Sequence, residues 1–294
     1  MNLFEIPLPA LLSQLLLGLV NGAFYAMLSL GLAVIFGLLN VINFAHGAFF
    51  MLGAVLAWIG LEYAGLGYWS MLLLAPLVVA GLAVVIEKSM LRWIYKLDHI
   101  YGLLLTLGIT LVIEGLLRSF YGVSGLPYST PDVLQGATDF GFMQLPNYRM
   151  WVVAASLGTC LATWYVIEKT RLGAYLRAGT ENPKVVEAFG VNVPTMVTLT
   201  YGFGVALAAF AGVLAAPVMQ VSPLMGQNLI IIVFAVVVIG GMGSIKGAIL
   251  TGLGLGVVEG LTKVFYPEAS STVVFAIMVI VLLLRPAGLF GKEQ

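Results

Sequence analysis

The sequence predicts an all-α fold of about nine (8–10) membrane-spanning segments, some of them broken or re-entrant, in a single transmembrane domain over residues 1–294. Hydrophobic residues make up 61% of the chain and charged residues only 9%, with a mean hydropathy of +1.07. A typical soluble domain has about 25% charged residues, so this chain has too few to cover a water-facing surface. Long apolar runs recur throughout, and two glycine-containing polar segments interrupt them.

The apolar runs can be counted, because a bilayer core of about 30 Å needs roughly 20 apolar residues per helix. The first run follows Glu5 without any Lys or Arg, and no small-residue cleavage site closes it, so we expect a retained span rather than a signal peptide. The run 229–239 is too short to cross alone unless it belongs to a broken helix. The predicted segments are 11–38, 47–63, 69–90, 101–121, 150–167, 194–219, 229–239, 248–265 and 272–284.

The basic residues predict the orientation, because cytoplasmic loops are enriched in Lys and Arg. With the amino terminus outside and the carboxyl terminus in the cytoplasm, only Arg118, Arg149 and Lys263 of the 13 basic residues lie outside. The opposite orientation would place ten of the 13 basic residues outside and only these three in the cytoplasm. In the predicted orientation, the basic residues on the cytoplasmic side are Lys88, Arg92, Lys96, Lys169, Arg171, Arg177, Lys184, Lys246, Arg285 and Lys292.

Two segments, 40–47 and 240–247, interrupt the apolar pattern where a charged loop would be usual. Non-helical backbone at membrane depth occurs only where it is buried in protein or lines a watery cavity, so both segments are candidates for broken helices. The alternative is that both are tight cytoplasmic turns in which glycine supplies positive φ angles. Both end in a polar residue followed by Gly-Ala, which is compatible with an internal repeat.

Asn40, Asn43 and His46 are the candidate residues of a transport path. An unsatisfied polar group inside a membrane costs several kcal/mol, so these side chains either line such a path or cap the ends of the first two spans. His99 is the only other histidine and no acidic cluster accompanies either one, so we assign no metal site. The single cysteine, Cys160, excludes an intrachain disulfide. We assign no catalytic residue.

Two acid–base pairs lie within predicted spans at a spacing of i,i+4, Glu114 with Arg118 and Glu259 with Lys263. Such pairs can neutralise each other on one helix face, or they can act in gating or in receiving a charged substrate. Glycines at the same spacing form ridges that let helices approach closely, and we expect this packing within the chain rather than between subunits. The ridges are Gly18 with Gly22, and Gly252 with Gly256 and Gly260.

Two longer polar intervals connect the spans. The interval 122–149 contains several prolines and aspartates, and it predicts external turns and short elements that can contact an extracytoplasmic partner. In the cytoplasmic interval 168–193, Asn182 is a good N-cap, Pro183 suits the first helical position and Gly190 can end a helix in the left-handed conformation. That helix has only about two turns, and helices so short need a surface to pack against. Its apolar residues are Val185, Val186, Ala188 and Phe189.

In this interval Gly173, Arg177-Ala178, Asn182-Pro183, Ala188 and Gly190 resemble the loop by which one family inserts a short coupling helix into its ATPase subunit. The family comprises the permeases of the high-affinity branched-chain amino-acid ABC importers, which are related to the ribose-type sugar permeases. The segment 43–48, Asn-Phe-Ala-His-Gly-Ala, resembles the family signature after the first span, and 240–244 resembles a second signature. The matches lie in the right order and cover nearly the whole chain.

The resemblance implies a bacterial inner-membrane permease subunit that imports branched-chain amino acids by alternating access. It implies as partners two ATPase subunits, a related second permease subunit and a periplasmic amino-acid-binding protein, besides membrane lipid. ATP and magnesium belong to the ATPases, because segment 240–246 lacks the spacing of a phosphate loop. The residues implied in coupling to the ATPase are Arg177, Ala178, Asn182, Pro183, Val186, Glu187, Ala188, Phe189 and Gly190.

Three other functions are alternatives to this interpretation. A permease for urea or another amino acid fits the same features, because specificity in such systems lies largely in the binding protein. A channel or facilitator with two re-entrant loops accounts for the interrupted segments but not for an apolar docking helix. An intramembrane enzyme requires a compact set of catalytic groups, which the two separated histidines do not supply. The equal numbers of acidic and basic residues, 13 each, give no basic field for nucleic acid.

Overall fold

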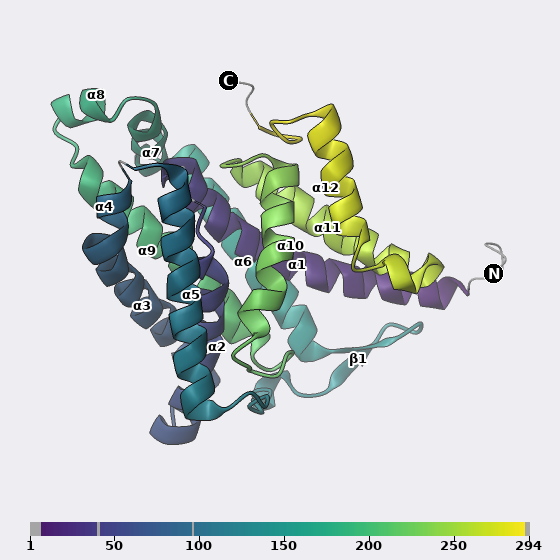
Figure 1. Cartoon of the computed structure of the whole chain (residues 1–294). Helices are drawn as coiled ribbons and strands as arrows, with labels where there is room; N and C mark the ends of the chain where they lie inside the picture. Colours follow the sequence, from purple (N-terminus) through teal and green to yellow (C-terminus); the bar gives the residue numbers. More distant parts are fainter. Residues whose placement is uncertain (1–6, 40–41, 96, 292–294) are drawn as a thin grey trace. The chain divides into compact units, whose positions relative to one another are not determined.

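The chain folds into helices over most of its length, as the sequence predicts (Figure 1). The computed structural model describes residues 7–39, 42–95 and 97–291. Within these residues, 7 helices are long and apolar enough to cross a membrane, the third of them continuing through two short elements to Ile94. They are α1 (Leu8–Leu39), α2 (Ala45–Ala64), α3 (Tyr68–Ile86), α5 (His99–Tyr121), α6 (Asn147–Lys169), α9 (Val193–Ala215) and α11 (Ile245–Phe265).

The remaining elements are shorter. Two are apolar helices, α10 (Met225–Gly240) and α12 (Val273–Leu284), and they coincide with the seventh and ninth predicted spans. Their crossing of the membrane, the total of nine spans and the internal repeat therefore stay predictions. The others are η1 (Glu87–Leu91), α4 (Arg92–Ile94), η2 (Asp132–Leu134), β1 (Ala137–Asp139), β2 (Gln144–Pro146), α7 (Arg171–Glu181), α8 (Pro183–Ala188) and η3 (Pro267–Ala269).

The chain divides into two compact units. Unit 1 comprises Met1–Ser29, Thr130–Cys160 and Ile232–Gln294, and unit 2 comprises Leu30–Ser129 and Leu161–Ile231. Each unit is thus built from segments far apart in the sequence. The function of the whole chain as a single permease domain stays a prediction.

The core of unit 2 is the packing of α2 against α3 and α9. Glycine permits the close approach of α2 and α9, because a Cβ atom at Gly53 would collide with the carbonyl of Ala209, and one at Gly212 with the carbonyl of Phe50. Phe49 and Tyr201 are fully buried in the same packing. Close helix contacts through small residues are usual in membrane proteins, where the hydrophobic effect gives no preference for helix association over lipid.

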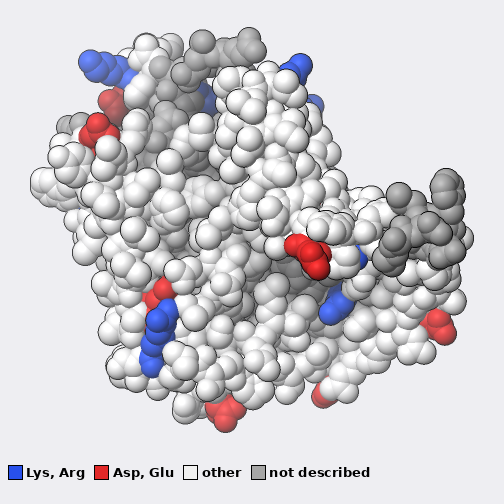
Figure 2. Space-filling view, turned by 45° about the vertical axis from the view of Figure 1, so that its right-hand side comes forward, with Lys and Arg blue, Asp and Glu red and all other residues white. Residues whose placement is uncertain are grey.

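The outer faces of α3 and α5 are apolar and exposed. They carry Leu73, Leu77, Leu104 and Leu111, all of which are exposed. Figure 2 shows a surface that is uncharged over wide areas, with the Lys, Arg, Asp and Glu side chains in small groups. Exposed apolar surface on this scale is unsuited to water and matches a lipid environment, as the composition predicts.

In unit 1, α1 and α11 pack through the two predicted glycine ridges. A Cβ at Gly18 would lie 2.5 Å from the Gly256 carbonyl oxygen, and one at Gly22 would lie 2.9 Å from the Leu253 carbonyl oxygen. Both distances are too short for a real side chain. The prediction that these ridges serve packing within the chain is confirmed.

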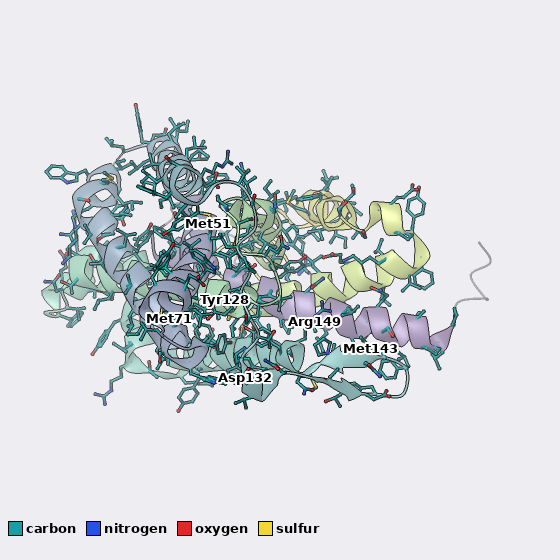
Figure 3. The ribbon with its side chains drawn as sticks, turned by 90° about the horizontal axis from the view of Figure 1, so that it is seen from below. Met51, Met71, Tyr128, Asp132, Met143 and Arg149 are labelled. Carbon is teal, nitrogen blue, oxygen red and sulfur yellow. The ribbon has the colours of Figure 1, made fainter. Side chains whose placement is uncertain are left out.

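The external interval begins after α5 ends at Tyr121 and continues to the start of α6. In its unit 1 part, η2 precedes the antiparallel hairpin of β1 and β2. Asp132, Met143 and Arg149 mark its course into α6 in Figure 3. The predicted turns and short elements are thus confirmed. In its unit 2 part, burial raises the pKa of the Tyr128 hydroxyl to about 12, which keeps this group neutral at ordinary pH.

Candidate functional site

The first interrupted segment lies between α1, which ends at Leu39, and α2, which begins at Ala45. The described residues 42–44 between the two helices are not helical, and a broken helix at membrane depth stays a prediction. Asn40, the first candidate path residue, lies outside the described residues. Asn43 and His46 are both fully buried. The segment is thus enclosed by protein, which is the condition for non-helical backbone at membrane depth.

Side chains from two other helices of unit 2 hold this segment. The Asn43 side chain donates from Nδ2 to the Tyr201 hydroxyl on α9 at 3.3 Å, whereas its Oδ1 atom is buried and has no hydrogen-bond partner among the described residues. On the other side, the Phe44 backbone amide donates to Thr106 Oγ1 on α5 at 3.2 Å. The segment therefore joins α9 to α5, and one buried acceptor is left over.

A second buried polar contact lies where α3 continues into η1, a five-residue π-helix. Glu87 is fully buried, and its Oε2 atom accepts a hydrogen bond from Thr198 Oγ1 of α9 at 2.7 Å. Arg92 donates to the same threonine hydroxyl at 3.1 Å, and its Nε atom lies 3.9 Å from Glu87 Oε1. Burial and the neighbouring Glu87 carboxylate raise the pKa of the Tyr95 hydroxyl. Single π-helical turns often occur at functional sites.

Glu87 and Thr198 are not among the predicted site residues. The only signal was a lone acidic residue inside the predicted span 69–90, beside Lys88. A carboxylate at that position is costly unless it has a partner, so it indicates a buried contact. The partner could not be named, because Thr198 is 111 residues away in the sequence.

Helix α9 makes both polar contacts from one face. Thr198 and Tyr201 are three residues apart, which places them side by side on a helix surface. Thr198 contacts Glu87, and Tyr201 contacts Asn43. The helix begins at Val193, five residues after α8 ends at Ala188, so α9 connects the cytoplasmic interval directly to these contacts.

The interval 168–193, which is predicted to be cytoplasmic, contains the predicted short helix, α8. The Asn182 side chain accepts a hydrogen bond from the Val185 backbone amide at 3.3 Å, Pro183 occupies the first turn, and Gly190 has a φ angle of 83°. These three predictions are confirmed. The preceding helix, α7, was not predicted. In Figure 1, α7 and α8 lie at the end of unit 2 that also contains α4 and the start of α9.

The residues predicted to contact an ATPase differ in exposure. Phe189 is 83% exposed and Ala188 is exposed, whereas Val186 is only 6% exposed and packs within the chain. The Arg177 guanidinium donates to the Ile167 carbonyl at the end of α6, so this side chain fixes α7 in place. The other predicted coupling residues are exposed, and their role in coupling stays a prediction. They are Ala178, Asn182, Pro183, Glu187 and Gly190.

The second interrupted segment, 240–247, forms a tight turn between α10 and α11 in unit 1. Gly241 and Gly243 have φ angles of 99° and 80°, and the Ser244 hydroxyl caps α11 by accepting from the Gly247 amide at 3.1 Å. The alternative interpretation of this segment, a turn that needs glycine for positive φ angles, is therefore the one that the backbone supports. The carboxyl-terminal segment covers this turn, with the Leu289 amide donating to the Ile239 carbonyl at 2.8 Å.

The two acid–base pairs that look alike in sequence differ in structure. In unit 1, Glu259 accepts hydrogen bonds from Lys263 Nζ at 2.6 Å and from the Tyr25 hydroxyl at 2.7 Å. In unit 2, Glu114 is 3% exposed, and its one charged partner among the described residues is Arg118, with Oε2 and Nη2 3.9 Å apart. Only the first carboxylate is fully satisfied. Across the described ranges, no group of three or more His, Cys, Asp or Glu residues is arranged to hold a metal ion.

Residues 14–282 match the family model described as the branched-chain amino acid transport system permease component. The chain is 29% identical over 298 residues to the high-affinity branched-chain amino acid transport system permease protein BraD of Pseudomonas aeruginosa, with 96% of each chain covered. It is 28% identical to LivH of Salmonella typhimurium, again over 96% of each chain. It is also 29% identical to LivM of the same organism, over 92% of this chain and 68% of LivM. No solved structure matches the chain.

Proposed function

The chain belongs to the family of branched-chain amino acid transport system permease components, and we propose that it is a membrane-spanning subunit of an ATP-binding cassette importer for these amino acids. BraD and LivH, which match it over nearly their whole length, carry names that specify high-affinity transport of branched-chain amino acids. These names favour that substrate class over urea. The observation that supports ATP as the energy source is the exposed apolar face of α8.

An exposed phenylalanine on a helix of only six residues needs an explanation. Helices this short are marginal in water, and the Asn182 cap contributes only about 1 kcal/mol. Phe189 is 83% exposed at the end of this helix. Unlike the exposed leucines of α3 and α5, it lies in a polar interval rather than in an apolar span. A protein partner accounts for it better than lipid does, and an ATPase subunit is the partner that an ATP-driven permease requires.

The proposed complex contains two ATPase subunits, a second permease subunit and a periplasmic binding protein. The similarity of the chain to both LivH and LivM, two permease proteins of one organism, supports a pore built from two related subunits. The external interval with its hairpin offers a contact region for the binding protein. The chain lies in the bacterial inner membrane with its amino terminus outside, which puts α7 and α8 in the cytoplasm.

Transport proceeds by alternating access, in which ATPase closure moves α8 and the movement reaches the membrane through α9. Thr198 and Tyr201 bring this helix into contact with η1 and with the segment that contains Asn43. A displacement of α9 therefore changes the surroundings of Asn43 and Glu87 together. The chain itself performs no covalent chemistry, and ATP and magnesium are bound by the ATPases.

The experiment is to express the chain with its ATPase subunits, purify it through its own tag, and measure ATPase co-purification and leucine uptake in proteoliposomes. Ala188→Arg places a charged side chain in the proposed contact, where burying an unpaired charge is costly, so both signals should be lost. Lys184→Ala on the same helix is the control, because a charge at the rim of an interface contributes little to affinity. Leucine flux that needs no ATP would refute the proposal in favour of a facilitator, and preferential uptake of urea would refute the substrate class.

A further inference from the structure

Helix α5 has an unusual distribution of polar residues. Its buried residues are Gly102, Thr106, Thr110 and Glu114, each one turn from the next. Its exposed residues are large and apolar, and they include Leu104, Leu107, Leu111, Val112 and Leu116. A helix in a soluble protein has the opposite arrangement, with its apolar face inward. An inward polar face on a helix with an apolar exterior is typical of segments that border a hydrophilic path through a membrane.

The contacts of α5 place this polar face along α2. Near the start of α5, Thr106 accepts from the Phe44 amide, just before α2 begins. At the other end, the ring of Tyr121 packs edge-to-face on Trp58 of α2, with centroids 5.4 Å apart. The two helices therefore run parallel, in the same direction. Thr110 and Glu114 lie between these two contact points, beside the middle of α2.

Two acceptor groups along the contact between α2 and α5 have fewer hydrogen-bond partners than buried polar groups normally have. Asn43 Oδ1 is buried without a hydrogen-bond partner among the described residues. Glu114 is 3% exposed, and within the described part of the chain it accepts no hydrogen bond and has only the Arg118 guanidinium at 3.9 Å. Both are acceptors, and at membrane depth such groups are normally paired. A ligand that donates hydrogen bonds would satisfy both acceptors, and a positive charge on it would favour the Glu114 carboxylate.

We propose that the buried face of α5 forms a section of the substrate path in unit 2, and that Glu114 receives the α-ammonium group of the amino acid as it passes. This inference rests on the proposed function, since it takes the substrate to be an amino acid. The ammonium group has three donors and one positive charge, so it fits a carboxylate flanked by threonine hydroxyls. Arg118, one turn further on, is placed to attract the carboxylate of the same zwitterion. Asn43 Oδ1 is a second acceptor for the ammonium group along the contact between α2 and α5.

The alternative is that Glu114 and Arg118 only neutralise each other. The comparison with Glu259 argues against it, because that carboxylate, at the same spacing from its lysine, makes two hydrogen bonds of 2.6 and 2.7 Å. Glu114 has no equivalent of Tyr25. In a pair with a purely structural role, we expect the buried carboxylate to be hydrogen-bonded, as that of Glu259 is.

The first test compares Glu114→Gln with wild type in proteoliposomes that contain the whole importer and saturating binding protein. The variant retains the shape of the side chain but loses the charge. Hydrogen bonds to a charged group contribute about 1.5–3 kcal/mol, so uptake of leucine should fall about ten- to hundredfold. Binding-protein-stimulated ATP hydrolysis should persist, because α8 is unchanged. Glu114→Asp should restore part of the uptake, and Glu62→Gln, at an exposed acid of α2, should have no effect.

The second test does not depend on that variant folding. Thr110→Cys and Leu111→Cys are introduced separately into a cysteine-free chain and treated with a charged thiol reagent during turnover. Cysteine 110 should react and be protected by leucine, whereas cysteine 111, on the apolar face, should stay unmodified. If wild type imports leucine but Glu114→Gln imports it equally well, or if only cysteine 111 reacts, the inference is overturned. If wild type imports no leucine at all, the proposed function itself fails.

Discussion

The exposed ring of Phe189 allows a sharp test of the proposed contact with an ATPase subunit. We predict that Phe189→Ala weakens binding of the ATPase subunit without disturbing the membrane part of the chain. The ring is 83% exposed, so it contributes little to the stability of the chain itself. Its loss should therefore appear in the complex and not in the isolated permease.

The magnitude follows from the exposed surface. An aromatic side chain carries about 150–250 Å² of surface, and burial of apolar surface contributes about 25 cal/mol per Å², so covering the exposed part of Phe189 contributes roughly 3–5 kcal/mol. The alanine methyl retains part of this contribution, which leaves a loss of about 2–3 kcal/mol. At about 1.4 kcal/mol per tenfold, the affinity for the ATPase should fall roughly thirty- to hundredfold.

The assay is titration of purified ATPase subunit onto the permease in nanodiscs, followed by ATP hydrolysis at saturating ATPase. Phe203→Ala is the matched control, because Phe203 is 41% exposed on the membrane helix α9 and undergoes the same change in side chain. It should leave ATPase affinity unchanged. Equal affinities for wild type and Phe189→Ala would show that α8 does not use its apolar end as the contact. A drop in both variants would indicate a general loss of structure instead.

Three further predictions concern the membrane part. Gly53→Leu should prevent stable folding, because even a Cβ at this position collides with the facing carbonyl of α9. Gly108→Ala should fold normally, because a Cβ at Gly108 meets open space. The two variants are compared by the amount of monomer that remains folded in detergent on heating. Thr198→Val should lower stability by about 1–3 kcal/mol, measured by unfolding in mixed detergent, because it removes the threonine hydroxyl that donates to the buried carboxylate of η1. Single cysteines at positions 132 and 184 should label from opposite sides of the membrane with an impermeant reagent, and labelling from the same side would refute the predicted orientation.

Local features of this fold could be predicted because each depends on a few neighbouring residues. The short helix α8 is an example, since Asn182, Pro183 and Gly190 mark its ends through backbone chemistry alone. The orientation of that helix could not be predicted in the same way. Val185 and Val186 are adjacent and chemically identical, yet only Val186 is buried, because burial depends on how the helix packs on the rest of unit 2.

Features that depend on partners far away in the chain could not be predicted from the sequence. Glu114 and Glu259 have the same i,i+4 basic neighbour, and nothing local separates them. The difference is Tyr25, which is 234 residues from Glu259 in the chain and reaches it only because the glycine ridges bring α1 and α11 together. A charge in a predicted span can therefore be recognised from sequence, but whether it is satisfied or available to a ligand depends on tertiary packing.

The contacts that anchor the interval 168–193 determine which membrane helices we expect to respond when α8 is displaced. On one side, α7 is fixed to the end of α6, because Gly173 allows contact with the Ile167 carbonyl and Arg177 donates to that same carbonyl. On the other side, α9 is fixed to η1, the continuation of α3, through Thr198. We therefore predict that a displacement of α8 acts on both α6 and α9, of which α9 contacts Asn43 through Tyr201. It follows that breaking the α6 anchor should impair the efficiency of coupling, whereas breaking the α9 contacts should separate ATP hydrolysis from the opening of the path.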